Sequence, residues 1–188
     1  TLNTIGLIEI ANDDMPFLVD SALAELNERQ LNPQLVVHPV YGVERDDNGR
    51  LIKLHADPFT GGNRESFIQL HVAPVEDDLR RRQIVDSLAD AFGQVRLAVL
   101  DWKAMLTRAS EVVGELKNSP PPLPVDEVAE AIQFLDWLRA NNFTFLGVRD
   151  YVLRNNELVP VQDTALGIMR SPDMRVLRRG KQLLEYTP

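Results

Sequence analysis

The chain has 188 residues, 44% of them hydrophobic and 26% charged, which suits one domain and part of a second with a sizeable core. Its formal net charge of −8 disfavours nonspecific nucleic-acid binding, so we expect no nucleic-acid partner. The absence of cysteine excludes disulfides, thiolate metal sites and cysteine nucleophiles. No apolar run approaches the roughly 20 residues that a membrane span needs, so we expect no membrane partner.

The chain opens with the pattern of a strand followed by an amphipathic helix. Residues 5–11 are apolar and contain β-branched isoleucines, which predicts a strand. Residues 16–30 predict a helix, because Leu18, Ala22 and Leu26 recur at four-residue spacing and form one buried stripe.

Two further strands, the first with a short returning arm, are predicted before residue 73. Residues 35–43 alternate in polarity, and the sequence DDNG at 46–49 is a turn that returns the chain through residues 51–54. Residues 64–72 form the next predicted strand, with Ile68, Leu70 and Val72 on one face. The predicted order is therefore β-α-β-β.

A long helix is predicted from about residue 76 to residue 117. Two apolar positions recur in it every seven residues, the first at Val85, Phe92, Val99, Leu106 and Val113, and the second at Leu88, Val95, Trp102, Ala109 and Leu116. We expect this seam to pack on the sheet and then, through Val99, Trp102 and Leu106, on the next helix. A coiled coil between two chains is the alternative interpretation.

The proline-rich residues 119–124 end that helix, and a second helix is predicted over residues 126–142. A strand over 144–153 then turns at 154–157 and returns through 158–162. Roughly the last 25 residues carry weak signals and could be partly disordered.

The most informative segment is the acidic turn at residues 12–21, NDDMPFLVDS. Asp13 and Asp14 lie where the first strand passes into the first helix, and Pro16 suits a first helical turn. The amides of that turn need a cap or a ligand. The acids are therefore either structural, as a helix cap, or able to hold the ammonium group of a small ligand.

The sequence contains no recognised catalytic or cofactor motif. It has no dinucleotide-binding glycine fingerprint after a strand, no phosphate-binding loop and no nucleophile elbow. His38, His55 and His71 have no second ligand at a favourable spacing, so we expect no metal site.

Several motifs in order resemble the N-terminal region of the large bacterial NAD-dependent glutamate dehydrogenases. They are NDDMPFLVDS, HPV at 38–40, RD at 45–46, RESFIQLHV at 64–72, QVRLAVLDWKAM at 94–105 and FLDWLRANNFTFLGVRDY at 134–151. The acidic, proline-containing turn is similar to that of ACT-type regulatory domains, whose pattern has glycine where this chain has Phe17.

The resemblance implies an α+β fold with an ACT-like, ferredoxin-type βαββα(β) sandwich over residues 1–100. Its second helix would extend into a helical hairpin over residues 101–143. Residues 144–188 would either complete the sheet or begin a second ACT-like unit.

The resemblance also implies a cytoplasmic, regulatory or architectural segment of an allosterically regulated oxidoreductase in amino-acid catabolism. Full-length relatives deaminate L-glutamate oxidatively with NAD, but two domains for that reaction do not fit here. We therefore expect no catalytic residue, cofactor site or metal in this segment. The expected partners are the rest of the polypeptide, further copies in a homo-oligomer, and an amino-acid effector held by Asp13, Asp14, Met15, Phe17 and Leu18. A freestanding amino-acid sensor and a ligand-free oligomerisation scaffold are the alternatives.

Overall fold

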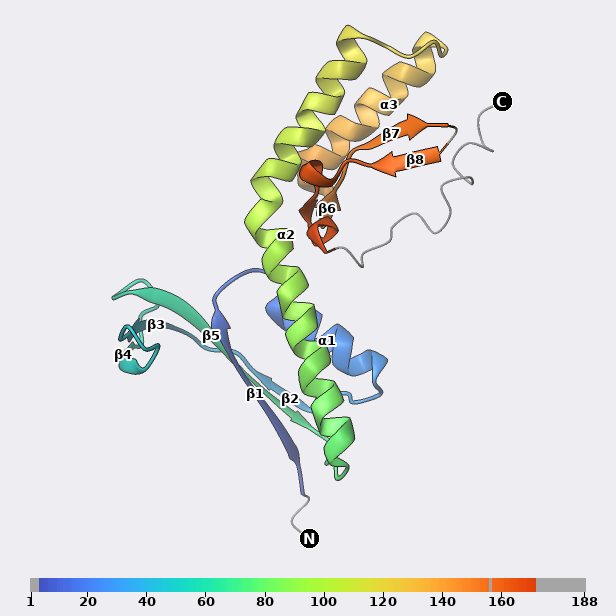
Figure 1. The fold of residues 1–188 in the computed structure, drawn as a ribbon. Coiled ribbons are helices and arrows are strands. Elements are labelled where there is room, and N and C mark those ends of the chain that lie inside the picture. Colours follow the sequence, from blue (N-terminus) through green and yellow to red (C-terminus); the bar gives the residue numbers. More distant parts are fainter. Residues whose placement is uncertain (1–3, 156, 172–188) are drawn as a thin grey trace. The chain divides into compact units, whose positions relative to one another are not determined.

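The computed structural model describes residues 4–155 and 157–171 and divides the chain into two compact units, residues 1–95 and 96–188. The elements of unit 1 are β1 (Gly6–Asp13), α1 (Leu18–Glu28), β2 (Leu35–Val37), β3 (Val40–Arg45), β4 (Leu51–His55), β5 (Asn63–Val72) and the first part of α2 (Asp78–Asn118). The predicted mixture of α and β elements with a long helix is confirmed, whereas the region before that helix contains five strands (Figure 1).

The sheet of unit 1 is antiparallel and follows the order β1-β5-β3-β4, with β2 also paired to β5. The central strand β5 holds β1 on one edge, from Gly6 opposite Val72 to Asp13 opposite Glu65. On its other edge it holds β2 and then β3. The sheet therefore depends on the full length of β5.

Helix α1 and the first part of α2 cover one face of this sheet (Figure 1). The predicted stripe of α1 is confirmed, because Leu18, Ala22 and Leu26 are all buried. The predicted inner face of β5 is confirmed as well, with Ile68, Leu70 and Val72 buried beneath the helices. On the opposite face of the sheet, Leu7, Leu35 and Val37 are exposed.

The single strand predicted over residues 35–43 is interrupted at His38 and Pro39, which separate β2 from β3. Both pieces keep one register against β5, and the N–H of Phe67 donates to the carbonyl of Pro39 at 2.9 Å. Proline has no N–H to return the second bond of that pair. The interruption is therefore a local loss of pairing without a shift of register.

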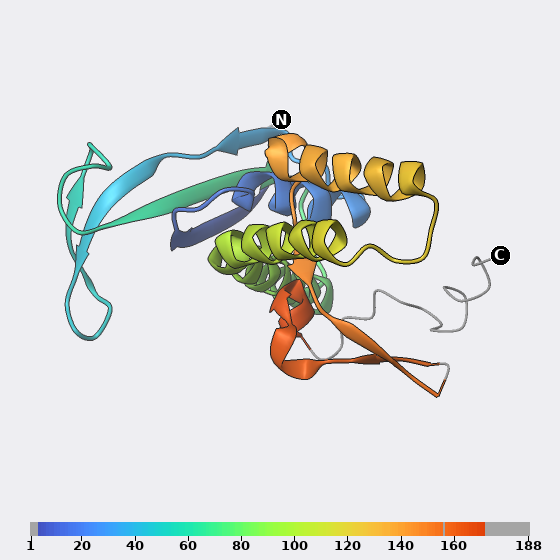
Figure 2. The same ribbon diagram turned by 90° about the horizontal axis from the view of Figure 1, so that it is seen from above.

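Strands β3 and β4 form an arm that extends past the end of helix α1 (Figures 1 and 2). Neither of the helices described in unit 1 covers β4, and Leu51, Ile52 and Leu54 are all exposed. The turn between the two strands is the predicted one, with Gly49 at a φ of 77°.

Helix α2 has nearly the predicted bounds, but its predicted apolar seam is partly wrong. Leu88 and Val95 are buried as expected, whereas Val85 and Trp102 are 61% and 49% exposed. At the first predicted position, the buried residues lie one residue earlier than Val85, Val99 and Leu106. They are Ile84, Ala98 and Met105. Val113, also part of the predicted seam, is buried.

Unit 2 contains the rest of α2, α3 (Val125–Trp137), a π-helical turn (Leu138–Asn142), β6 (Gly147–Val148), β7 (Tyr151–Arg154), β8 (Glu157–Pro160) and β9 (Leu166–Gly167). Two 3-10 turns, Gln162–Thr164 and Ile168–Arg170, complete it. The predicted strand over 144–153 is wrong in detail, because residues 149 and 150 separate β6 from β7.

The strands of unit 2 pair only with one another among the described residues, β6 with β9 and β7 with β8. They therefore do not complete the sheet of unit 1. Residues 164–171, the first part of the segment that was expected to be partly disordered, contain β9 and a 3-10 turn. Its remainder, residues 172–188, lies outside the described residues.

The shifted seam gives a prediction for stability. Met105 is fully buried, so Met105→Ala should lower the free energy of unfolding by about 2–5 kcal/mol. Trp102→Ala should cost less than Met105→Ala because half of the indole is already in water, and Lys103→Ala on the exposed face is the control. Urea unfolding followed by circular dichroism measures all three. A larger loss for Trp102→Ala than for Met105→Ala would contradict the shifted seam.

Candidate functional site

The acidic turn joins the end of β1 at Asp13 to the start of α1 at Leu18. Pro16 is followed by Phe17 at φ 72° and ψ 0°, and these positions suit the two central residues of a type II turn. Helix α1 therefore begins two residues later than predicted. Its N-cap, Phe17, makes no side-chain cap hydrogen bond, so the helix-cap interpretation of the two acids is not what the structure contains.

Asp14 instead fastens the turn to the central strand β5. Its backbone N–H donates to the carbonyl of Arg64 at 2.9 Å, and its Oδ1 accepts from Ser66 Oγ at 2.8 Å. The guanidinium of Arg64 lies 3.5 Å from its Oδ2. Ser66 is fully buried, so Asp14 supplies the partner that this hydroxyl needs away from water.

Three strands meet beside this turn in a row of charges. Asp13 of β1 lies opposite Glu65 of β5, and Glu65 is bound by Arg45 of β3. Nε and one Nη of Arg45 each donate to a different carboxylate oxygen at 2.6 Å, which is the bidentate arrangement. The hydrogen bond from Arg45 lowers the pKa of Glu65, although burial opposes this.

The five predicted effector-binding residues are brought to one junction but have different surroundings. Asp14 is engaged with Ser66 and Arg64, and Leu18 is buried in the core beneath the sheet. Met15 is half-buried, while Phe17 is 45% exposed. The side chains of Asp13 and Phe17 are therefore the more accessible part of the junction.

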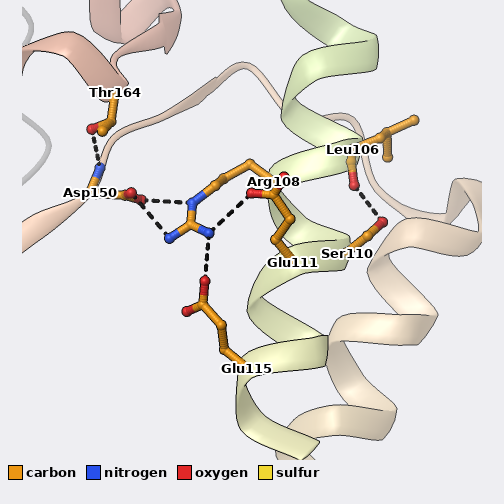
Figure 3. Close-up of polar contacts among 7 residues, drawn as sticks. All are labelled: Leu106, Arg108, Ser110, Glu111, Glu115, Asp150 and Thr164. Carbon is orange, nitrogen blue, oxygen red and sulfur yellow. Dashed lines mark hydrogen bonds and ion pairs between the residues drawn. The ribbon is translucent and has the colours of Figure 1, made fainter. Parts of the chain in front are cut away.

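Unit 2 contains a separate charge cluster around Arg108 of α2 (Figure 3). Its guanidinium binds both carboxylate oxygens of Asp150 at 3.1 Å, and also Glu115 at 2.9 Å and Glu111 at 3.2 Å. The hydrogen bond to Glu115 is the largest of several effects that raise the pKa of Arg108 further above its ordinary value. The N–H of Asp150 also donates to Thr164 Oγ1, which ties the 150–164 segment to α2.

A second anchor of unit 2 is Asp101, also on α2. It accepts from the N–H of Gly167 at 2.8 Å and forms an ion pair with Arg170, whose guanidinium lowers the pKa of Asp101. Gly167 has a φ of 59°, and a Cβ there would lie 2.2 Å from the carbonyl oxygen of Leu146. Only glycine therefore fits this turn.

Sequence reasoning did not assign roles to Asp101, Arg108, Asp150 and Arg170. Asp101 and Asp150 lie inside the motifs QVRLAVLDWKAM and FLDWLRANNFTFLGVRDY, which was the only available signal. Their partners are 66 and 42 residues away in sequence, beyond the reach of local patterns.

The described residues contain no group of three or more potential metal ligands. His55 of β4 is paired with Glu44 at 2.6 Å, while His38 lies in the interruption between β2 and β3. None of the helices in the described ranges is long and apolar enough to cross a membrane.

Comparison with known proteins identifies the first unit. Residues 3–88 match the family model described as "Glutamate dehydrogenase, ACT1 domain". Over these residues the chain is similar to the ACT1 domain of glutamate dehydrogenases. The match covers every strand of the five-stranded sheet, the helix α1 and the beginning of α2, and it includes the acidic turn.

Curated relatives extend the similarity beyond the ACT1 domain. The chain is 35% identical to the NAD-specific glutamate dehydrogenase of Halomonas elongata over 94% of its own length and 11% of the relative. It is 30% identical to that of Pseudomonas aeruginosa over 79% of the chain and 9% of the relative. The Mycobacterium tuberculosis protein of the same name is 20% identical over 87% of the chain and 10% of the relative. The chain thus spans about a tenth of the length of these relatives.

The positive φ of Phe17 predicts a difference in stability between two substitutions at this position. A left-handed conformation costs a residue with a Cβ about 1–2 kcal/mol, and glycine avoids this cost. Phe17→Gly should therefore be more stable than Phe17→Ala by about 1 kcal/mol, although both lose the ring. Chemical unfolding of the two variants measures this difference. A more stable alanine variant would contradict the strain at Phe17.

The Glu65–Arg45 pair predicts how the stability of unit 1 depends on pH. Because the pKa of Glu65 is lowered in the folded state, the carboxylate stabilises the fold. Its full contribution to the free energy of unfolding is present above the ordinary glutamate pKa of about 4.3. The contribution is lost as pH falls from there through the lowered value. At neutral pH, Glu65→Gln should cost about 1–3 kcal/mol, and this deficit should shrink on acidification. Urea unfolding at a series of pH values tests this, with substitution of the exposed Glu28 of α1, Glu28→Gln, as the control. A deficit that stays constant from neutral pH to pH 3 would contradict it.

Proposed function

We propose that this chain is a regulatory and architectural segment of a large NAD-dependent glutamate dehydrogenase. The observation that carries the proposal is similarity to NAD-specific glutamate dehydrogenases along 94% of the chain. The ACT1 match over residues 3–88 supports a regulatory role for the first unit.

In this proposal the longer protein oxidatively deaminates L-glutamate to 2-oxoglutarate with NAD in the cytoplasm. The segment itself supplies no catalytic residue and binds no cofactor. The carboxylates and arginines of the acidic turn are committed to one another across β1, β5 and β3, which supports a structural role for most of that cluster.

The architecture of the segment follows from its two units. Unit 1 corresponds to an ACT-like, ferredoxin-type βαββα unit, with β4 added as the outer strand of an arm. Residues 101–143 form the helical extension. The separate small sheets of residues 144–171 support the start of a second ACT-like unit. Asp101 and Arg108 then anchor that second unit to the extended helix α2.

Binding of an amino-acid effector at the acidic turn is the more specific form of the regulatory proposal. Asp13 and Asp14 would hold the ammonium group, with Met15 and Phe17 beside the side chain of the effector. Asp14 would have to exchange its contact with Arg64 for the ligand, because both of its carboxylate oxygens are occupied. The phenyl ring at Phe17 fills the place where the ACT pattern has glycine.

The catalytic half of the proposal is tested with two proteins. The purified 188-residue chain should form no NADH from glutamate and NAD, whereas the natural polypeptide that contains it should do so. NADH formation by the short chain, or its absence from the natural polypeptide, would contradict the proposal. Absorbance at 340 nm measures both.

The effector site is tested by calorimetric titration of the chain with a panel of amino acids. Asp14→Asn keeps an oxygen for the Ser66 hydroxyl but removes the charge, so any binding should weaken while the fold is kept. Phe17→Gly restores the ACT pattern and should strengthen binding. Absence of heat with every amino acid, in the parent chain and in Phe17→Gly, would assign the turn a structural role alone.

A further inference from the structure

We propose that the outer face of helix α3 is a docking surface for a basic amphipathic helix, which the remainder of the natural polypeptide contributes. This inference rests on the proposed function, because it needs the chain to be a segment of a longer protein. It concerns unit 2 alone. Its basis is a row of acidic and aromatic side chains that α3 presents to solvent.

The inner face of α3 is already used by the fold. Val128, Ile132 and Leu135 recur at spacings of four and three, and they are buried or half-buried. Figure 1 shows α3 alongside the second half of α2, within the same unit. The position of α3 is therefore fixed from one side, and its other side is available to a partner.

The outer face of α3 contains a second row of side chains. Glu127, Glu130, Phe134 and Trp137 follow one another at spacings of three, four and three, and all four are exposed. These spacings place the four side chains in line along one side of the helix. A row of this kind is what a second helix contacts when it lies lengthwise against the first.

The C-terminal half of this row is an apolar anchor. Phe134 is 57% exposed and Trp137 is 51% exposed, and their rings stack with centroids 6.1 Å apart and planes at 13°. Stacking limits the freedom of both side chains, so little further entropy is lost when a partner covers them. Tryptophan is also among the residues that dominate the binding energy of protein interfaces. This half of the row therefore selects apolar side chains on the partner.

The N-terminal half of the row is a set of uncompensated charges. Within the part of the chain that the structure describes, neither Glu127 nor Glu130 forms an ion pair. Asp136 on the same helix shows the contrast, because it binds Arg139 at 2.6 Å and Lys117 at 3.7 Å. This half of the row therefore selects lysine or arginine on the partner.

These charges favour a different segment over a second copy of α3. Parallel pairing of two copies would place Glu127 and Glu130 opposite themselves, and like charges destabilise such a pair. Antiparallel pairing would place each carboxylate against an aromatic ring without supplying a cation. The chain spans about a tenth of the length of its relatives, so the proposed polypeptide contains many other segments. A helix with a basic half and an apolar half complements the row.

The first test is hydroxyl-radical oxidation of Trp137, measured by mass spectrometry in the 188-residue chain and in the natural polypeptide. Oxidation should be several-fold slower in the natural polypeptide, because the docked helix covers the indole. Glu127→Lys combined with Glu130→Lys should restore most of the faster rate there. The control is Asp86→Lys combined with Asp90→Lys, which makes the same charge change at exposed positions of α2 in unit 1 and should leave Trp137 protected.

The second test identifies the occupant by zero-length carbodiimide coupling, which joins a carboxylate to a lysine amine. In the natural polypeptide, Glu127 or Glu130 should couple to a lysine outside these 188 residues. Equal oxidation of Trp137 in both proteins, protection that survives the charge reversal, or coupling only to lysines within residues 1–188 would each overturn the proposal. Neither test measures NADH, so failure here is distinguishable from failure of the proposed function.

Discussion

Strand β5 is hydrogen-bonded along both edges, and the rest of unit 1 depends on this double pairing. Its even-numbered residues bond to β1 and turn their side chains towards the helices, while odd-numbered residues such as Phe67 bond to the β2–β3 side. One alternation thus sets both the sheet and the core. Ser66 belongs to the inner set, so its hydroxyl requires a polar partner under the helices, and Asp14 supplies it across 52 residues of sequence.

The elements with one dominant periodicity could be predicted from the sequence. In α1 no second apolar stripe repeats as regularly as Leu18, Ala22 and Leu26, and these three residues are buried as expected. Helix α2 differs because apolar residues stand side by side at each turn, as in Ala98–Val99 and Met105–Leu106. Either set satisfies the seven-residue spacing. Tertiary contacts select which set is buried, and those contacts are not encoded in local periodicity.

The candidate site was predictable in position but not in chemistry. The proline and the two acids marked the junction of β1 and α1, and the ACT pattern marked Phe17 as the place of a glycine. The structure gives the physical reason, since that residue has a positive φ. The sequence suggested that such acids cap a helix, but the partners of Asp14 and Glu65 lie on other strands. Only the three-dimensional fold shows that these carboxylates link strands.

Pro39 has a mechanical consequence for the sheet. Opposite Phe67 the ladder has a single hydrogen bond where a residue with an N–H would form two, so the pairing is weaker there than at an ordinary hydrogen-bonded pair. The ion pair between Glu65 and Arg45 links β5 to β3 just beyond that point. We therefore expect a load applied to the exposed arm of β3 and β4 to bend the sheet first at Pro39.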